Sequence, residues 1–358
     1  MNRGLRWPLV AIVLAALAMQ ACGQVTQSAL PLERAAVAEP TTTTTSTTTT
    51  LPPPPPPVTT AAAPPSTAPH PRAPVTAAPK RTTPKAARPA VTGGVAAYVG
   101  FGTWVDVFDW TDQWTNNNPT VGPADADRMA SLGIQTLYIQ AARIDGPNGV
   151  AEPARLNAII QRAHAHGIRV VVWYLPTLTD VNADLSRLLA IAALPVEGIA
   201  VDIESREVSD PNDRSARLVD LSNRLRAALP GRTIGGIVFP PTGMEVINPS
   251  YWPGFPWGGI AHDYDVWLPM AYWTGRDPNS GWHDGYKYVV DNVQRTRNDL
   301  HDPSALVHPI GGIGDKATTS EVAGMVRAVA ATASIGGSLY DYRTTSADMW
   351  SAMTPLRR

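Results

Sequence analysis

The chain contains a complete strand–helix–strand unit: GIAVDIE at 198–204, PNDRSARLVDLSNRLRAAL at 211–229 and TIGGIVF at 233–239. The first and last segments are short and apolar, as buried strands are. In the middle segment leucines recur at helical spacing. Asp210-Pro211 suits the start of this helix, and Pro230-Gly231 suits its end. Strands joined through a helix run parallel in one sheet, so the unit predicts an α/β fold.

The same alternation of strand and helix extends over residues 95–358. Further helices are expected at 152–167 and 319–333. The eight expected strands are Ala97–Phe108, Ile134–Ala141, Ile168–Tyr174, Gly198–Glu204, Thr233–Phe239, Tyr264–Tyr272, Leu306–Gly311 and Gly337–Tyr342. Eight such units in this length match a (β/α)8 TIM barrel, whose usual size is about 250 residues. No glycine-rich phosphate-binding turn follows the first strand, which disfavours a doubly wound sheet.

Residues 1–22 have the features of an export signal. Two arginines precede an apolar run from Leu9 to Met19, which is too short for the ~20 residues of a membrane span. Ala21-Cys22 then resembles a bacterial lipobox, so we expect Cys22 to be lipidated. An ordinary signal peptide cleaved near Ala21 is the alternative. Either version places the mature protein outside the cytoplasm, on the membrane surface or in the cell wall.

Residues 23–94 are rich in threonine, proline and alanine. Such a segment has too few large apolar side chains to form a core, and we expect a disordered tether. Its proline-rich parts favour extended polyproline II structure. The tether would carry the barrel away from a membrane and into the cell wall, or act as a plain solvated spacer.

Charge and cysteine content exclude several classes of protein. Residues 95–358 carry 21 basic and 28 acidic side chains, a net charge of −7, which excludes a basic nucleic-acid-binding domain. One cysteine cannot form a disulfide within the chain. The histidines are scattered without the spacing of metal ligands. We therefore expect neither a metal nor another cofactor.

The strand at 198–204 supplies two acids where a barrel enzyme needs them. Active sites of TIM barrels lie at the C-terminal ends of the strands. Because side chains alternate along a strand, Asp202 and Glu204 both point into the barrel, about 7 Å apart. Close carboxylates in a partly dry site raise the pKa of one of them, giving a general acid. Glycoside hydrolysis needs such an acid and a second group that stabilises the positive sugar. A structural pair of acids held in salt bridges is the alternative.

Other strand-end residues complete the expected site. Tyr272 is placed on the inner face as a hydroxyl donor near the acids, whereas only one of Tyr340 and Asp341 is expected to face the centre. Aromatic residues in 251–257 would suit stacking on sugar rings at the barrel mouth. The expected substrate-binding residues are Asp106, Trp104, Gln140, Arg143, Met270, Trp273, Tyr340 and Asp341.

The acid pair also resembles a known pattern. Family 18 glycoside hydrolases, the chitinase-like group, carry Asp-x-x-Asp-x-Asp-x-Glu on strand four, and its last part is present as Asp202 and Glu204. Met270-x-Tyr272 is similar to that family's Met-x-Tyr on strand six. The resemblance implies Glu204 as the acid, Asp202 as the residue that orients the substrate's acetamido group and Tyr272 as its hydrogen-bond partner. The acetamide itself would be the nucleophile.

The chain also departs from that pattern and matches a second one. Glu197 and Ala200 stand where family 18 has its first two acids, and Tyr340 stands where it usually has tryptophan. Family 25, the lysozyme-like muramidases, has acids on strands one, four and eight. The residues that would fill those places are Asp106, Asp202, Glu204 and Asp341.

These features predict an exported cell-envelope glycoside hydrolase. Its substrate would be a glycan that contains N-acetylhexosamine, namely peptidoglycan or a related polysaccharide, and its other partner a membrane reached through the lipid anchor. The main alternative is a glycan-binding barrel without catalysis, tethered in the envelope. A further alternative is a structural envelope protein in which the barrel is a spacer.

Overall fold

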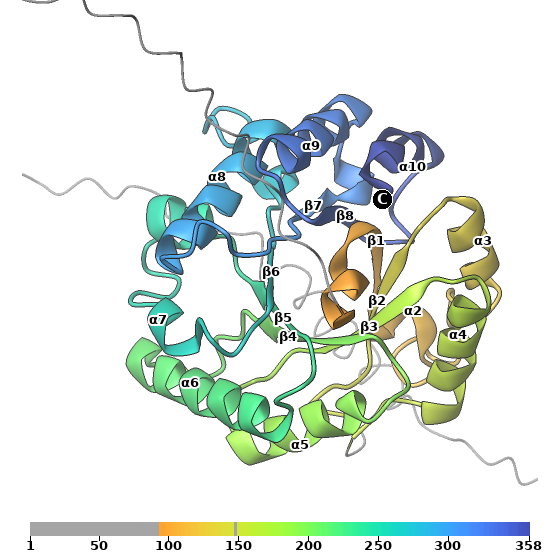
Figure 1. Ribbon diagram of the computed structural model, residues 1–358, viewed down its shortest axis with the longest axis horizontal. Helices are drawn as coiled ribbons and strands as arrows, with labels where there is room; N and C mark the ends of the chain where they lie inside the picture. The colour runs from red at the N-terminus through yellow and green to blue at the C-terminus, as the bar shows by residue number, and fades with distance from the viewer. Residues whose placement is uncertain (1–92, 147–148) are drawn as a thin grey trace, which may run out of the picture. The chain divides into compact units, whose positions relative to one another are not determined.

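The computed structural model describes residues 93–146 and 149–358, which form a ring of parallel strands surrounded by helices (Figure 1). The strands are β1 (Gly100–Val105), β2 (Thr136–Gln140), β3 (Arg169–Tyr174), β4 (Gly198–Ile203), β5 (Ile234–Val238), β6 (Val266–Pro269), β7 (Ile310–Ile313) and β8 (Gly336–Tyr340). The expected signal peptide, Cys22 and nearly all of the tether lie outside the described residues.

Helices alternate with the strands around the ring. The α-helices are α2 (Val107–Trp110), α3 (Asp125–Ser131), α4 (Pro153–Ala165), α5 (Val181–Ala192), α6 (Pro211–Ala228), α7 (Trp257–Ile260), α8 (Gly285–Asp299), α9 (Thr319–Ala331) and α10 (Ala347–Met353). Shorter turns are η1 (Gly93–Tyr98), the π-helical η2 (Gly243–Ile247), η3 (Trp273–Gly275), η4 (Gly314–Lys316) and η5 (Thr354–Leu356).

The strand order confirms the predicted (β/α)8 barrel. The sheet runs β6-β5-β4-β3-β2-β1-β8-β7, with every adjacent pair parallel. Two parallel bridges, from Trp267 to Val307 and from Met270 to Ile310, connect β6 to the start of β7. The sheet is therefore nearly closed, and the C-terminal ends of its strands meet around one opening.

Capping residues explain where the helices begin. Asp210 accepts hydrogen bonds from the backbone N–H groups of Asn212 and Asp213 at the start of α6, with Pro211 as its first residue. Thr318 and Glu321 form a capping box at the start of α9. Such caps satisfy backbone donors that have no partner inside the helix. The helix starts expected near 210 and 319 are therefore confirmed.

Several strands end earlier than the sequence suggested. β1 stops at Val105 because the Asp106 side chain accepts a hydrogen bond from the Phe108 N–H at 2.8 Å and caps α2. β6 stops at Pro269, and the chain then turns into η3. β8 ends at Tyr340 rather than Tyr342. These corrections matter because alternation of side chains applies only within a strand.

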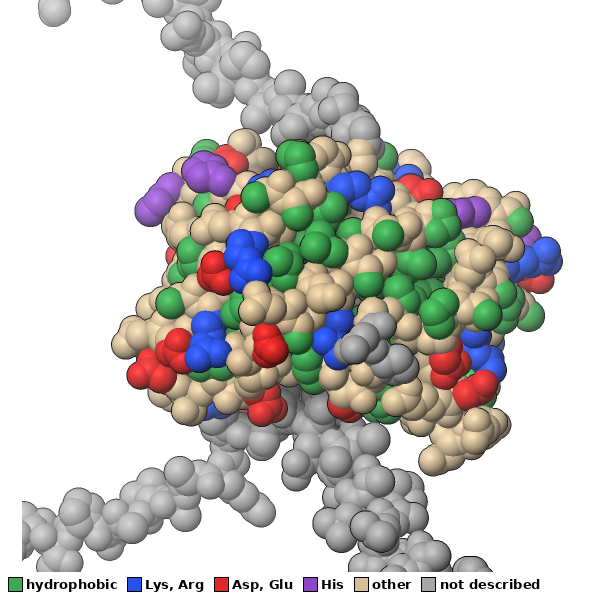
Figure 2. All heavy atoms as spheres, turned by 90° about the horizontal axis from the view of Figure 1, so that it is seen from below, with side chains coloured by type: hydrophobic (Ala, Val, Ile, Leu, Met, Phe, Trp, Pro, Cys, Tyr) green, Lys and Arg blue, Asp and Glu red, His purple; other side chains and the backbone are tan. Residues whose placement is uncertain are grey.

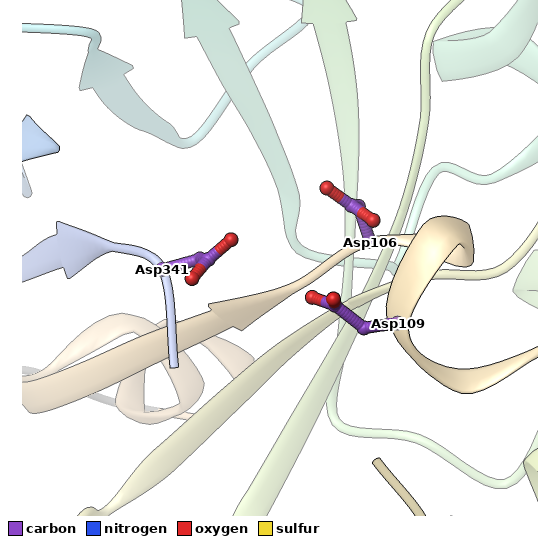
Figure 3. A group of neighbouring side chains, drawn as sticks. All are labelled: Asp106, Asp109 and Asp341. Carbon is purple, nitrogen blue, oxygen red and sulfur yellow. The ribbon is translucent and has the colours of Figure 1, made fainter. Parts of the chain in front are cut away.

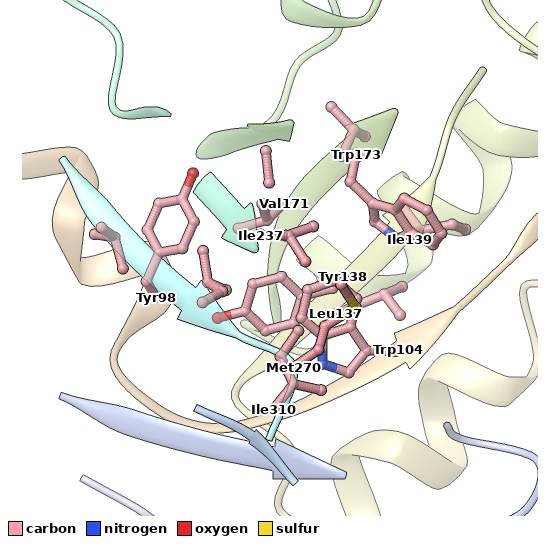
Figure 4. Close-up of a cluster of buried hydrophobic side chains, with 14 of the residues drawn as sticks. Tyr98, Trp104, Leu137, Tyr138, Ile139, Val171, Trp173, Ile237, Met270 and Ile310 are labelled. Carbon is pink, nitrogen blue, oxygen red and sulfur yellow. The ribbon is translucent and has the colours of Figure 1, made fainter. Parts of the chain in front are cut away.

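A polar network lies in the barrel core and includes groups of Tyr98 and Trp104, two of the buried residues labelled in Figure 4. The fully buried His308 bonds through Nδ1 to the Tyr98 carbonyl at 2.8 Å, so Nδ1 is the donor. Its Nε2 then accepts from the Ser338 hydroxyl at 3.0 Å, and Ser338 accepts from the Trp104 indole at 2.8 Å. Burial lowers the pKa of His308 to about 4, which keeps the ring neutral.

Two glycines leave room for the ring of Tyr98 beside this network. The hydroxyl of Tyr98 donates to the Ile199 carbonyl at 2.6 Å, between β4 and β5. A Cβ at Gly198 would lie 2.7 Å from the Tyr98 hydroxyl, and one at Gly235 would lie 2.9 Å from its ring. Close approach of an aromatic ring therefore requires glycine at both positions.

The outer surface carries mixed charge. Acidic and basic side chains are interspersed over the face shown in Figure 2 rather than gathered by sign. Pairs along α6, Arg217 with Asp213 and Arg224 with Asp220, illustrate this mixing. Among the described residues, no helix has both the length and the apolar character to cross a membrane.

Candidate active site

A pocket of about 220 Å³ opens at the C-terminal ends of the strands. Its walls come from β1 to β4 and from β6 to β8, together with the loops that follow them. The lining residues are Asp106, Phe108, Gln140, Arg143, Trp173, Leu175, Asp202, Glu204, Met270, Tyr272, Ile313, Asp315, Lys316, Tyr340, Asp341 and Thr344. Nine of the side chains expected from the sequence are among them. Barrel closure thus brings together residues that lie more than 200 positions apart in the chain.

The acid pair of β4 lies in this pocket. Asp202 is 7% exposed, and its Oδ1 has no hydrogen-bond partner within the described part of the chain. Burial and then the negative charge of Glu204 raise the pKa of Asp202 well above its ordinary value. Burial raises the pKa of Glu204 to about 7. Both groups therefore hold protons more tightly than free carboxyl groups do, and Glu204 can give or take one near neutral pH.

The segment after β5 holds the backbone of Glu204. The buried Tyr251 hydroxyl donates to the Glu204 carbonyl oxygen at 2.9 Å. Its ring stacks on Phe239, with the centroids 3.8 Å apart, and the guanidinium of Arg206 lies 5.1 Å from its ring centroid. Tyr251 therefore lies against the back of the acid rather than in the pocket.

The other aromatic residues of this segment are also packed internally. Trp252 is 2% exposed and bonds to Ser215, and Phe255 packs between it and Trp257. They do not line the pocket. The expectation that aromatic residues of 251–257 form a sugar-stacking mouth is therefore wrong, because they build the wall behind β5 and β6.

Two tyrosines line the pocket at the ends of β6 and β8. The Tyr272 and Tyr340 ring centroids lie 6.0 Å apart, and the Tyr340 hydroxyl donates to Asp106 Oδ2 at 2.7 Å. Burial, then the charges of Glu204 and Asp202, raise the pKa of Tyr272 well above its ordinary value. Its hydroxyl therefore stays protonated and is able to donate a hydrogen bond.

Three aspartates converge beside Tyr340 (Figure 3). One carboxylate oxygen from each of Asp106, Asp109 and Asp341 lies within 4.8 Å of the others. Burial, and then the charges of Asp106 and Asp341, raise the pKa of Asp109 to about 7, and Arg343 binds Asp109 at 2.8 Å. These oxygens could hold a cation only in competition with Arg343 and with protons. The raised pKa values favour a shared-proton cluster.

Tyr340 and Asp341 both line the pocket, contrary to the expectation that only one would. Asp341 follows the last residue of β8, so strand alternation does not reach it. The peptide bond between the two residues is cis. Asp341 is held by Thr344, whose N–H donates to Asp341 Oδ1 at 2.9 Å.

Two expected residues lie outside the pocket lining. Trp104 is 1% exposed and stacks on Tyr138, with the ring centroids 4.3 Å apart, inside the barrel core. Trp273 is fully buried in η3, where it packs against Gly311 and Gly312. Trp104 lies too deep along β1. Trp273 follows the turn after β6, where alternation no longer predicts direction.

The pocket also contains residues that the sequence analysis did not select. Trp173 lies near the end of β3, and Lys316 and Asp315 follow β7. The strand-end rule applied to 168–174 would have found Trp173. No local sequence pattern predicted that Lys316 would line the pocket, because its position depends on the loop between β7 and α9.

Comparisons with known proteins show the fold. No protein-family model and no curated protein matches this chain. The spore cortex-lytic enzyme SleL of Bacillus cereus has a TM-score of 0.54 at 11% identity, covering 73% of this chain and 74% of its own. The GH18 chitinase of Cycas revoluta, solved in complex with (GlcNAc)3, has a TM-score of 0.52 at 10% identity, covering 71% and 98%. At these identities the likeness establishes the barrel fold only, so the chemistry has to be argued from the residues of the pocket.

Proposed function

We propose that this protein is a glycoside hydrolase that cleaves a glycan containing N-acetylhexosamine. The observation that carries this proposal is the acid pair, because Asp202 and Glu204 share one pocket at the strand ends and both have raised pKa values. Pairs of carboxyl groups with shifted pKa values are what glycoside hydrolysis requires. The fold shared with a chitinase and with SleL is consistent with this chemistry.

Glu204 acts first as the acid. It protonates the glycosidic oxygen, and the bond from that oxygen to the anomeric carbon breaks. The acetamido oxygen of the same sugar bonds to the anomeric carbon and leaves a positive ring. Water then attacks the anomeric carbon, the bond from that carbon to the acetamido oxygen breaks, and the water gives its proton to the Glu204 carboxylate, which restores the acid.

Asp202 and Tyr272 hold the acetamido group during these steps. An acetamido N–H is a donor, and the unpartnered Oδ1 of Asp202 is a buried acceptor in the pocket. Burial raises the pKa of Asp202, but a positive intermediate beside it favours the ionised form, and the ionised carboxylate in turn stabilises the intermediate. Tyr272 donates to the acetamido oxygen and orients it toward the anomeric carbon.

The size of the pocket favours one sugar unit at its bottom. A volume of about 220 Å³ is below the roughly 300–1,000 Å³ of common ligand pockets. The rest of the glycan would extend from the opening across the loops. In the cell we place this activity in the envelope, on peptidoglycan or a related polysaccharide, with Cys22 as the lipid anchor. That placement rests on the composition of residues 1–94.

The decisive experiment replaces the acid. We predict that Glu204→Gln lowers the release of reducing ends from peptidoglycan or N-acetylglucosamine oligomers by at least about 100-fold, the usual effect of losing a general acid. The matched control is Glu207→Gln, an exposed acid three residues further along. Full activity in Glu204→Gln with an intact fold would remove Glu204 from the mechanism.

A glycan-binding barrel without catalysis is the second candidate. It is favoured because the first two acids of the family 18 pattern are replaced by Glu197 and Ala200. Ala200 has no carboxylate. Glu197 lies directly before β4, where its side chain accepts a hydrogen bond from the Val170 N–H at 2.8 Å, and it does not line the pocket. Retention of glycan in a pull-down, with no reducing ends released by the parent protein, would favour this function.

A further inference from the structure

The indole N–H of Trp173 is an unpaired donor on a side chain that lines the pocket. Trp173 lies in β3, is 5% exposed and lines the pocket. Its Nε1 has no hydrogen-bond partner among residues 93–146 and 149–358. Buried donors are normally paired, so an unpaired one on a pocket-lining side chain points to a ligand or a bound water.

Other buried indoles show what pairing looks like here. The Nε1 atoms of Trp104, Trp110 and Trp252 donate to Ser338, to the Gln140 carbonyl and to Ser215 at 2.8 to 3.0 Å. Trp273 also lacks a partner, but it is fully buried away from the pocket lining. Trp173 therefore differs from these indoles, because its unpaired N–H belongs to a side chain that lines the pocket.

The register of the strands shows what surrounds this donor. Trp173 pairs with Gln140 of β2 on one side and with Ala200 of β4 on the other. Gln140 already uses its side-chain oxygen to accept from the Val107 N–H at 3.2 Å. Ala200 has no polar side-chain atom. The indole donor of Trp173 therefore finds no free side-chain acceptor on either of its register neighbours, Gln140 and Ala200.

Asp202, with its unpaired acceptor Oδ1, lies two residues beyond Ala200 on β4. The residues that carry this donor on β3 and this acceptor on β4 thus line the same pocket from adjacent strands. A sugar unit that presents both an N–H and an oxygen acceptor would satisfy the two groups together. A ligand without an acceptor at that position would leave the indole N–H buried and unpaired, which weakens binding.

We propose that Trp173 is a specificity-determining residue whose Nε1–H donates a hydrogen bond to an oxygen of the sugar unit held by Asp202. This inference rests on the proposed function. The oxygen belongs either to the acetamido carbonyl or to a ring hydroxyl, and both are neutral acceptors that the indole donor suits.

Binding to an inactive protein tests this assignment without turnover. In the full chain carrying Glu204→Gln, we expect Trp173→Phe to weaken binding of the N-acetylglucosamine tetramer about tenfold, the order expected for one hydrogen bond. The matched control is Trp350→Phe in α10, which removes an indole outside the pocket. Near-UV circular dichroism and thermal unfolding check the fold of each variant.

A second measurement does not depend on Trp173→Phe folding correctly. In nitrogen-15 tryptophan-labelled Glu204→Gln protein, the indole resonance of Trp173 should move downfield, and its proton should exchange more slowly, as the tetramer saturates the site. An indole resonance that stays unchanged at saturation would overturn the proposal. So would Trp173→Phe binding the tetramer as tightly as its parent.

A second ligand shows which oxygen of the sugar accepts the hydrogen bond from Trp173. If the effect of Trp173→Phe disappears with the de-N-acetylated tetramer, the acceptor is the acetamido carbonyl. If the effect persists, the acceptor is a ring hydroxyl. Saturable binding with an unaffected Trp173 would remove this inference alone. Intact binding together with no hydrolysis by the unmodified protein would remove the proposed catalysis and leave this inference standing.

Discussion

At the scale of single residues, the environment of Glu204 decides what its carboxyl group can do. Burial raises its pKa to about 7, so the group is largely protonated at mildly acidic pH. Asp202 lies two residues earlier with its own raised pKa, and the two acids titrate as a pair. The pair therefore holds a proton at the pH where an acid catalyst has to supply one.

This arrangement predicts a basic limb in the pH profile. Because catalysis starts with protonated Glu204, kcat/KM should fall about tenfold per pH unit above an apparent pKa near 7. The measurement is the rate of reducing-end release from pH 4 to 9 on an N-acetylglucosamine oligomer. A rate that stays constant up to pH 9 would contradict the assignment of Glu204 as the acid.

At the scale of elements, the segment between β5 and β6 acts as a support for β4. Its Tyr251 bonds to the Glu204 carbonyl oxygen, and stacking on Phe239 fixes the ring that carries this hydroxyl. The acid is thus positioned through its main chain by a neighbouring element. Tyr251 is a positioning residue, since it does not line the pocket.

Removal of that hydroxyl should loosen the acid. We predict that Tyr251→Phe lowers kcat roughly threefold to tenfold with little change in KM, because one hydrogen bond that holds Glu204 is lost. The control is Tyr264→Phe, which removes another buried hydroxyl, bonded to Ser222 at 2.8 Å, away from the pocket. Equal losses in both variants would indicate a general effect on stability. The steady-state kinetics should be measured with thermal unfolding beside them.

At the scale of the whole molecule, buried acids and one buried histidine act in opposite directions on stability. Raised carboxyl pKa values stabilise the folded state at low pH, and this contribution is lost as pH rises through about 7 for Glu204 and Asp109. His308, with its pKa lowered to about 4, contributes stability at neutral pH that is lost as pH falls from about 6.5 to 4. The acids outnumber the histidine, so the barrel should be most stable at mildly acidic pH.

One variant isolates this effect. Because glutamine cannot ionise, Glu204→Gln should be more stable than the parent at pH 8 by about 1–3 kcal/mol, in line with a pKa raised from about 4.5 to about 7. The difference should vanish at pH 4, where Glu204 is neutral in both the folded and unfolded chains. Denaturant unfolding at the two pH values measures it. An equal difference at both would show that ionisation of Glu204 is not its cause.

Local patterns in the chain were enough to predict the barrel, the starts of α4, α6 and α9, and the inward direction of Asp202 and Glu204. Helix caps, the lengths of apolar runs and the alternation of side chains each depend on residues that are close in sequence. Loop positions were less accessible to such reasoning. Asp341 and Trp273 lie just beyond β8 and β6, and the direction of a side chain after a strand depends on the turn that follows.

Closure of the barrel decided the rest. It buried Trp104 in the core, placed Tyr251 behind Glu204 and set Trp173 beside Ala200 at the pocket floor. Each of these contacts depends on the register and packing between segments that are far apart in the chain, and no local pattern encodes that register. The residue types of the acid pair are therefore a property of the sequence, whereas their burial, and with it their raised pKa values, comes from the folded barrel.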